Sequence, residues 1–201
     1  MFTGIVEEVG TVHRLEENQS IHRYQILATV AFAEGVKTGD SICVNGVCLT
    51  VCNVRDDSFQ VDVSTETRKC TTFGTSAQKG QVNLERSAMP STRLGGHIVS
   101  GHVDGIGRLM VREDGEGESV LWIAIPDNLS RYIVPKGSVC VDGVSLTVNQ
   151  VEKNRFCVTV IPHTLKSTTL GHLQPGTEMN IEVDLMARYL ERLMQDRGQA
   201  T

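Results

Sequence analysis

Short stretches of alternating apolar and polar residues recur along most of this chain. Examples are YQILATV (24–30), VCLTVCNV (47–54) and FQVDV (59–63), and glycine, asparagine or aspartate residues separate such stretches. Alternation with a period of two is typical of β-strands that bury one face. The pattern predicts an all-β fold with a first strand within residues 1–12, tight turns at Asn45-Gly46 and Asp142-Gly143, and a loop over residues 75–81.

The segment DLMARYLERLMQDR (184–197) follows a different period. Its apolar residues recur every three or four positions, which predicts an amphipathic helix with Asp184 as its N-cap. A shorter helix is expected within residues 126–133, after Pro126. The apolar stripe of the long helix can pack on the chain's own barrel or against further copies of the chain, and the sequence leaves both arrangements open.

One stretch occurs twice. SICVNGVCLTV (41–51) and SVCVDGVSLTV (138–148) are identical at eight of eleven positions and lie 97 residues apart. The same offset relates further residues on both sides, so the two halves are expected to share one backbone. We therefore predict two domains, residues 1–97 and 98–184, joined by a linker in residues 86–96, and a terminal helix in residues 185–201. Each copy has room for about six short strands, which favours two six-stranded β-barrels.

The repeat is chemically asymmetric. Four pairs of equivalent residues place a reactive or charged group in one copy only, and they are Cys48/Ser145, Asn45/Asp142, Gly39/Lys136 and Ile5/His102. Hydroxyl groups, in contrast, occur in both copies, at Ser41, Thr50, Thr67, Ser145, Thr147 and Thr164. Such hydroxyls can hold a polyhydroxylated ligand, although threonine is also an ordinary strand residue. The pattern predicts two similar pockets whose chemistry has diverged.

Composition narrows the function. The chain has 201 residues, a net charge of −5 and 40% hydrophobic residues, without an apolar run of membrane length. We therefore expect no nucleic-acid surface and no membrane span, and with no signal peptide visible we expect a cytoplasmic protein. The six cysteines form no C-x-x-C pair, and phosphate-loop and nucleophile-elbow motifs are missing. Neither a metal site nor a disulfide framework is expected.

Six segments resemble the riboflavin synthase family of the alpha-chain type: MFTGIVEEVG, VNGVCLTV, LGGHIVSGHVDG, KGSVCVDGVSLTVN, IPHTLKSTTLG and NIEVDLMARYLERL. The resemblance covers essentially the whole chain. It implies two six-stranded Greek-key β-barrels with a C-terminal helix, assembled as a homotrimer. Active sites would lie between the first barrel of one subunit and the second barrel of a neighbour.

The implied reaction joins two molecules of 6,7-dimethyl-8-ribityllumazine. One gives a four-carbon unit to the other, which yields riboflavin and 5-amino-6-(ribitylamino)uracil. No cofactor is implied, because the electrons stay within the substrate pair. An association with lumazine synthase is implied as a further partnership.

The resemblance also assigns residues to the site. The catalytic positions of the family fall on Cys48, His102, Lys136, Ser145 and Ser41. All of these except Ser41 would also touch substrate, together with Phe2, Gly4, Ile5, Val6, Leu49, Thr50, Asp62, Val63, Ser64, Thr65, Glu66, Thr67, His97, Gly101, Val103, Asp142, Leu146, Thr147, Ile161, Pro162, His163, Thr164, Leu165, Lys166 and Asp184.

Two alternative functions fit a duplicated barrel. One alternative is a non-catalytic lumazine- or flavin-binding protein of the same superfamily. Such a protein would have lost the residues of one half-site, whereas both copies here keep the V-N/D-G-V-C/S-L-T-V pattern. A pair of oligonucleotide-binding barrels would need basic grooves with stacking aromatics. Only 4% of the residues are aromatic and the net charge is −5, which disfavours that second alternative.

Overall fold

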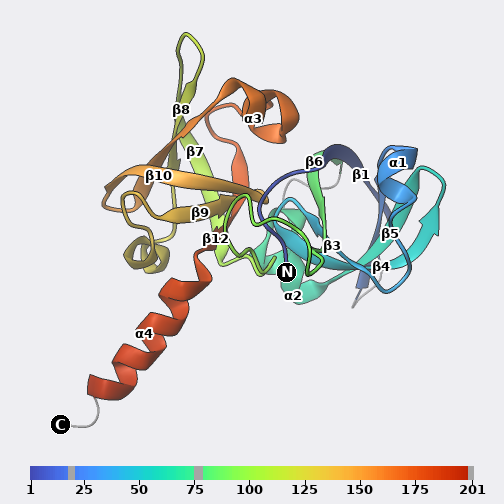
Figure 1. Cartoon of the computed structure of the whole chain (residues 1–201), viewed down its shortest axis with the longest axis horizontal. Coiled ribbons are helices and arrows are strands. Elements are labelled where there is room, and N and C mark those ends of the chain that lie inside the picture. Colours follow the sequence, from blue (N-terminus) through green and yellow to red (C-terminus); the bar gives the residue numbers. More distant parts are fainter. Residues whose placement is uncertain (18–20, 75–78, 199–201) are drawn as a thin grey trace.

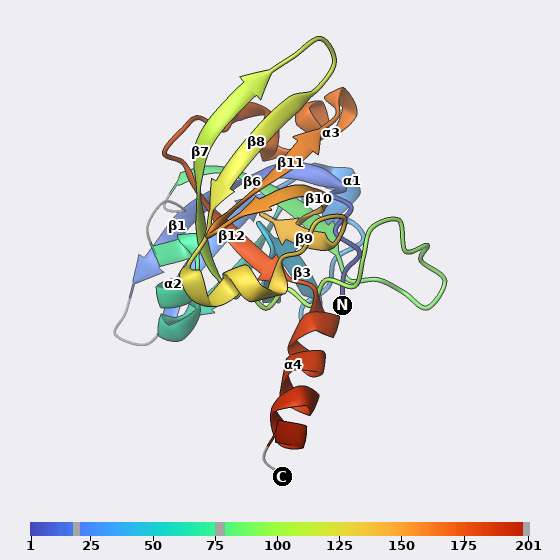
Figure 2. The same ribbon diagram turned by 90° about the vertical axis from the view of Figure 1, so that its left-hand side faces the viewer.

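The computed structural model describes residues 1–17, 21–74 and 79–198. Two closed antiparallel barrels of six strands each make up most of it, and a C-terminal helix projects away from them (Figures 1 and 2). This architecture confirms the tandem β-barrels with a terminal helix that the sequence predicts.

Barrel 1 has the strand order β1-β2-β5-β4-β3-β6, which is a Greek-key arrangement because β5 returns beside β2. Its strands are β1 (Glu8–Glu17), β2 (Ile21–Leu27), β3 (Ser41–Val44), β4 (Val47–Arg55), β5 (Ser58–Ser64) and β6 (Lys79–Arg86). Its helical turns are α1 (Val30–Ala33), α2 (Thr65–Cys70) and η1 (Thr72–Gly74).

Barrel 2 repeats the same order with β7-β8-β11-β10-β9-β12. Its strands are β7 (Gly105–Asp114), β8 (Ser119–Ala124), β9 (Ser138–Val141), β10 (Val144–Glu152), β11 (Arg155–Val160) and β12 (Glu178–Val183). Its helical turns are η2 (Asp127–Tyr132), α3 (Pro162–Ser167) and η3 (Thr169–His172). The short helix expected within residues 126–133 is therefore present as η2.

The alternating sequence pattern explains why each barrel has a core. In β8, Ser119, Leu121 and Ile123 are buried, and the residues between them are only half-buried. Inward residues of this kind form one apolar cluster per barrel, around Phe59 in barrel 1 and around its repeat-equivalent Phe156 in barrel 2. Each barrel thus buries its own interior, as a period of two predicts.

The strand predicted for residues 1–12 is wrong in its position. β1 begins only at Glu8, and residues 1–7 lead to the other repeat, where Phe2 and Val99 exchange backbone hydrogen bonds of 2.8 and 3.1 Å. Gly4 bends this segment with φ +75°, a conformation that favours glycine. Gly4 therefore marks a change of direction in the chain.

Two smaller differences concern connections between strands. A strand was expected over residues 24–30, but β2 ends at Leu27 and α1 follows, because the hydroxyl of Thr29 caps it by accepting a hydrogen bond from the amide N of Phe32 at 3.3 Å. The loop expected over residues 75–81 falls partly outside the described residues, and β6 already begins at Lys79.

The two barrels meet across a nearly symmetric set of hydrogen bonds. The side-chain amide of Asn83 donates to the carbonyl O of Asp142 at 2.9 Å, and that of Asn180 donates to the carbonyl O of Asn45 at 2.8 Å. Asn83 and Asn180 are repeat-equivalent, as are Asn45 and Asp142. Each barrel therefore satisfies polar backbone groups of the other, which fixes how the two pack together.

Helix α4 (Leu185–Gly198) leaves barrel 2 after Asp184, whose carboxylate accepts a hydrogen bond from the amide N of Met186 at 2.9 Å. Ion pairs of Arg188 with Asp104 at 2.5 Å and of Glu191 with Arg131 at 2.8 Å tie the helix to barrel 2. Its apolar stripe remains exposed, at Met186, Tyr189, Leu190, Leu193 and Met194. Across the three described stretches of the chain, none of the helices has the length and apolar character of a membrane span.

Candidate functional site

An opening in the wall of barrel 1 lies where two neighbouring strands part. β4 pairs with β3 from Val47 to Thr50 and with β5 only from Val51 onward. β5 itself continues beside β2 as far as Ser64, where α2 begins. The first half of β4 and the end of β5 therefore diverge, which exposes strand-edge backbone groups that can bind a ligand.

Residues from the other repeat close this opening. The amide N of Cys48 donates a hydrogen bond to the carbonyl O of Gly101 at 2.8 Å, and Val103 packs against the core of barrel 1. Gly101 has φ +80°, and a Cβ there would stand 2.5 Å from the Cβ of Cys48, so glycine is required. We call the surface formed by residues 48–50, 62–67 and 101–103 half-site 1.

Barrel 2 has the equivalent opening, closed by the first residues of the chain. The amide N of Ser145 donates to the carbonyl O of Gly4 at 2.8 Å, and Val6 packs against the core of barrel 2. We call the surface formed by residues 145–147, 161–166 and 4–6 half-site 2. The two entering segments have thus exchanged barrels, and each half-site contains residues of both repeats.

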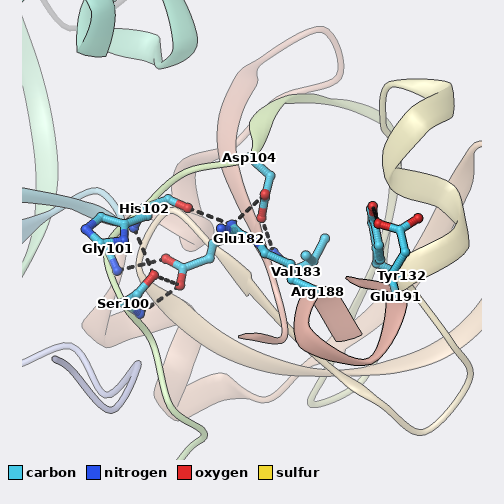
Figure 3. Close-up of polar contacts among 9 residues, drawn as sticks. All are labelled: Ser100, Gly101, His102, Asp104, Tyr132, Glu182, Val183, Arg188 and Glu191. Atoms are coloured by element: carbon cyan, nitrogen blue, oxygen red, sulfur yellow. Dashed lines mark hydrogen bonds and ion pairs between the residues drawn. The ribbon is translucent and has the colours of Figure 1, made fainter. Parts of the chain in front are cut away.

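A buried carboxylate holds each entering segment in place. Glu85 accepts hydrogen bonds from the amide N and hydroxyl of Thr3 at 2.6 and 2.7 Å and from the amide N of Gly4 at 3.0 Å. Glu182 repeats this pattern with Ser100 and Gly101 at 2.7, 2.6 and 2.9 Å (Figure 3). Burial raises the pKa of both carboxyl groups, while these hydrogen bonds act in the opposite direction. The two glutamates therefore fix the backbone of the half-sites.

The two half-sites differ at their centres. In half-site 2, the hydroxyl O of Ser145 lies 2.6 Å from Nδ1 of His97. Burial lowers the pKa of His97, opposed by the nearby charge of Asp184, so the ring is neutral near pH 7 and can accept a proton. In half-site 1, the equivalent position carries the half-buried thiol of Cys48, and His102 follows Gly101 with an exposed side chain.

A hollow of about 600 Å³ lies between barrel 1 and the linker that follows β6, with Val36, Arg86 and Met89 among its walls. The linker forms the green loop that projects from the barrels in Figure 2. At the repeat offset of 97, linker residues 88–95 correspond to residues 185–192, which form the start of α4. The hollow therefore lies where the linker takes the place that α4 has on barrel 2.

Comparison with known proteins decides the family. The sequence pattern described as lumazine binding domain matches the chain twice, at residues 3–87 and 100–184. Riboflavin synthase from Mycobacterium bovis is 46% identical to this chain and covers 98% of it and 100% of its own length. The chain belongs to the riboflavin synthase family. Riboflavin synthase from Photobacterium phosphoreum, another member, is 43% identical over 96% of this chain and 89% of its own length.

A solved structure shares the fold of this riboflavin synthase family member. LumP in complex with riboflavin superimposes with a TM-score of 0.85 over 91% of this chain and 99% of its own, at 26% sequence identity. LumP has also been solved with 6,7-dimethyl-8-(1'-D-ribityl) lumazine, at a TM-score of 0.82. The tandem barrel is thus a fold on which both ligands have been observed in a relative.

The structure places the catalytic positions expected from the riboflavin synthase family at both half-sites. Cys48 and His102 lie at half-site 1, and Ser145 lies at half-site 2. Ser41 is the register neighbour of Thr50 across the β3–β4 hairpin, at the rim of half-site 1. Lys136 lies just beyond half-site 2, because its amide N donates to the carbonyl O of Val148 at 2.8 Å, and its side chain is exposed.

Other expected residues have structural roles that the sequence did not indicate. Asp142 is buried at the junction of the barrels, where its carboxylate accepts from the amide N of Asn180 at 2.7 Å. Phe2 is buried in an apolar cluster between the barrels. Asp62, in half-site 1, is held by Arg23 through two hydrogen bonds of 2.7 and 2.8 Å. Neither copy holds a complete half-site by itself, because each half-site borrows its entering segment from the other copy.

Sequence reasoning missed the residues that organise this exchange. Glu85 and Glu182 are buried in strands, and they occur at equivalent positions together with Asn83 and Asn180. Polar side chains that are buried in a strand normally have hydrogen-bond partners. That signal, repeated at the offset of 97, could have identified them as anchors.

Proposed function

We propose that this chain is a riboflavin synthase, a transferase that converts two molecules of 6,7-dimethyl-8-ribityllumazine into riboflavin and 5-amino-6-(ribitylamino)uracil. The observation that carries the proposal is a pair of half-sites with one backbone frame and different central residues. Two copies of the same substrate need similar surfaces, whereas a donor and an acceptor of a four-carbon unit need different chemistry. Relatives named riboflavin synthase, at 37–46% identity over nearly the whole chain, support this reading.

We assign proton transfer at half-site 2 to Ser145 and His97. The neutral ring of His97 can take the hydroxyl proton across the 2.6 Å contact, which makes the oxygen a better acceptor for a substrate proton. At half-site 1, the thiol of Cys48 and the imidazole of His102 act as nucleophile or proton carrier. Lys136 supplies positive charge beside half-site 2.

Hydroxyl groups around both centres are suited to the ribityl chains. Thr50 and Thr147 are exposed on the first halves of β4 and β10, and Thr67 and Thr164 lie in the short helices α2 and α3. Their equivalent places in the repeat provide two similar hydrogen-bonding surfaces. Holding both substrates in register would supply proximity, which can be worth about 7–11 kcal/mol of the barrier.

We further propose a homotrimer in which half-site 1 of one copy faces half-site 2 of a neighbour. The exposed apolar stripe of α4, which runs from Met186 to Met194, supports assembly, because such a stripe on a projecting helix needs a cover. A cytoplasmic location agrees with six cysteines that are all free. Co-purification with lumazine synthase would test the association that the family resemblance implies.

Incubation of the purified chain with 6,7-dimethyl-8-ribityllumazine alone tests the proposed reaction. We expect riboflavin and 5-amino-6-(ribitylamino)uracil in equal amounts, each at half the amount of lumazine consumed. Binding of lumazine and riboflavin without turnover would contradict the proposal. It would instead identify a carrier of these ligands, for which LumP is the fold relative.

A further inference from the structure

The hairpin that carries Cys48 also places a second thiol directly opposite it. In the antiparallel pairing of β3 and β4, the register partners are Cys43 and Cys48, next to the Val44–Val47 pair that flanks the Asn45-Gly46 turn. Register partners on neighbouring strands point to the same face of the sheet. The two thiols therefore lie side by side.

Cys43 and Cys48 form a non-hydrogen-bonded pair, the kind of antiparallel pair in which the two Cα atoms lie closer together. In a hairpin closed by two residues, the pair beside the turn exchanges hydrogen bonds and the next pair does not. The amide N of Cys48 donates instead to the carbonyl O of Gly101 at 2.8 Å, on the side of β4 away from β3. Non-hydrogen-bonded partners have Cα atoms about 4.5 Å apart, which is within the span of a disulfide.

The two thiols differ in their exposure to solvent, so they would react at different steps of an oxidation. Cys48 is half-buried and packs against an apolar cluster that includes Cys43 and Cys140. Cys43 and Cys140 are only 2% and 1% exposed, so an oxidant in solution reaches Cys48 first. Burial raises the pKa of Cys43 well above its usual range, so Cys43 stays a thiol and does not compete with Cys48 for the oxidant.

We propose that Cys43 and Cys48 form a reversible disulfide when the protein meets a peroxide. The thiolate of Cys48 attacks one oxygen of hydrogen peroxide, the O–O bond breaks, and hydroxide leaves and takes up a proton. Cys43 then loses its proton and attacks the sulfur of Cys48, which forms the S–S bond and releases the oxygen as water. Two thiols are oxidised by two electrons and one peroxide is reduced to two waters.

Other pairings are less favourable. Cys52 lies four residues from Cys48 on the same strand, about 13 Å along it, which is beyond the reach of a disulfide. Cys140 belongs to the same cluster as Cys43, but its own register partner is Ser145. The second barrel therefore carries the same hairpin with one sulfur replaced by oxygen, and serves as an internal control.

The bridge would inactivate half-site 1, because the sulfur of Cys48 would no longer be a free thiol and would be bonded to the buried Cys43. This consequence rests on the proposed function, whereas the bridge itself does not. Disulfides that solvent can reach are the more readily reduced ones, and half-buried Cys48 leaves one sulfur of this bridge accessible to a thiol reductant. Oxidation of the half-site would therefore be undone by a thiol reductant.

Disulfide mapping of the full chain tests the proposal without an activity assay. The native protein is treated with hydrogen peroxide, its free thiols are blocked with N-ethylmaleimide in denaturant, and it is digested with trypsin. Residues 38–55 form one tryptic peptide. We expect this peptide to have lost two hydrogens, with fragment ions that place the bridge between Cys43 and Cys48 and leave Cys52 blocked.

Three variants sharpen the test. Cys43→Ala should abolish the bridge, and Cys140→Ala, a matched loss of a buried thiol from the same cluster, should leave it intact. Ser145→Cys should create a second bridge to Cys140 in the peptide of residues 137–153. If Cys43→Ala fails to fold, the wild-type map and the Ser145→Cys gain still decide.

The outcomes that overturn the proposal are distinct. They are a link between the two tryptic peptides of the wild type, a sulfinic acid at Cys48 beside a blocked Cys43, or no oxidation at all. After peroxide treatment, dithiothreitol should restore riboflavin formation in the wild type but not in Cys43→Ala. This difference would connect the bridge to function. If no riboflavin forms even before oxidation, the proposed function fails while the mapped bridge stands.

Discussion

The amide N of Cys48 donates a hydrogen bond to the carbonyl O of Gly101, 2.8 Å away, and so joins the strand of one repeat to the entering segment of the other. The same bond recurs between Ser145 and Gly4 at 2.8 Å. Neither barrel therefore has a complete half-site of its own. The duplication produced two sites within one chain, each of which depends on a segment from the other repeat, and their central residues differ.

The contact at Gly101 should tolerate no side chain. Gly101→Ala would force a Cβ to 2.5 Å from the Cβ of Cys48 at φ +80°, so we expect the free energy of unfolding to fall by about 2–4 kcal/mol. Gly39→Ala is the matched control, because Gly39 also has a positive φ of 94° but nothing within 4 Å, and its repeat-equivalent Lys136 already carries a side chain at φ 67°. It should cost about 1 kcal/mol. Equal losses in urea denaturation of the two variants would contradict the close approach at Gly101.

Cys48→Ser should keep the fold and lower the rate of riboflavin formation severalfold or more. Serine already occupies the equivalent position 145 in the same backbone frame, so packing accepts the change, but a hydroxyl is a weaker nucleophile and a weaker acid than a thiol. Cys70→Ser, on the exposed side of α2, is the control and should retain full activity. A fully active Cys48→Ser protein would remove the thiol from the mechanism.

Asp142 should make stability depend on pH. Burial raises the pKa of Asp142 to about 7, whereas aspartate in an unfolded chain has a pKa of about 3.9. Its contribution is therefore fully present below about pH 4 and is lost as pH rises through about 7, because over this range the unfolded state releases its proton while the folded state keeps it.

Asp142→Asn should remove that loss. Relative to the wild type, we expect the variant to gain up to about 4 kcal/mol in the free energy of unfolding between pH 4 and pH 8. An asparagine fits, because the repeat-equivalent Asn45 accepts from the amide N of Asn83 at 2.7 Å, just as Asp142 accepts from Asn180. Denaturant titrations across this pH range measure the difference, and parallel curves for the two proteins would show that Asp142 is ionised in the folded state throughout.

Removal of residues 185–201 should release monomers and abolish riboflavin formation without unfolding the barrels. The exposed stripe of α4 would be lost, while each barrel keeps its own apolar cluster. Sedimentation velocity and circular dichroism of the truncated chain decide the matter. A trimer that persists without α4 would show that the barrels alone hold the assembly.

The sequence was sufficient for the overall architecture. A fixed offset of 97 predicted equal barrels, whereas the assignment of diverging chemistry to the Cys48/Ser145 pair stays a prediction. The exchange of segments could not be predicted, because a repeat is equally compatible with self-contained and crossed copies. Which of these forms depends on whether Glu85 and Glu182 capture Thr3 and Ser100 within hydrogen-bonding geometry, and that is a property of tertiary structure.

The position of Asp142 was missed for a related reason. Its difference from Asn45 suggested chemistry, but both residues occupy the first position of a turn with positive φ, 46° and 47°, at the junction of the barrels. Burial there leaves the side chain hydrogen-bonded to the amide N of Asn180. A polar difference between repeats can thus reflect a buried structural contact as well as diverging chemistry.

A crystal structure with riboflavin, which the enzyme forms and does not consume, tests the crossed half-sites most directly. We predict one riboflavin against residues 48–50 and 62–67 with its ring beside Gly101–Val103 of the same chain, and a second one against Ser145 beside Gly4–Val6. Riboflavin seated instead in the hollow of about 600 Å³ along the linker, against Val36 and Met89, would contradict the account.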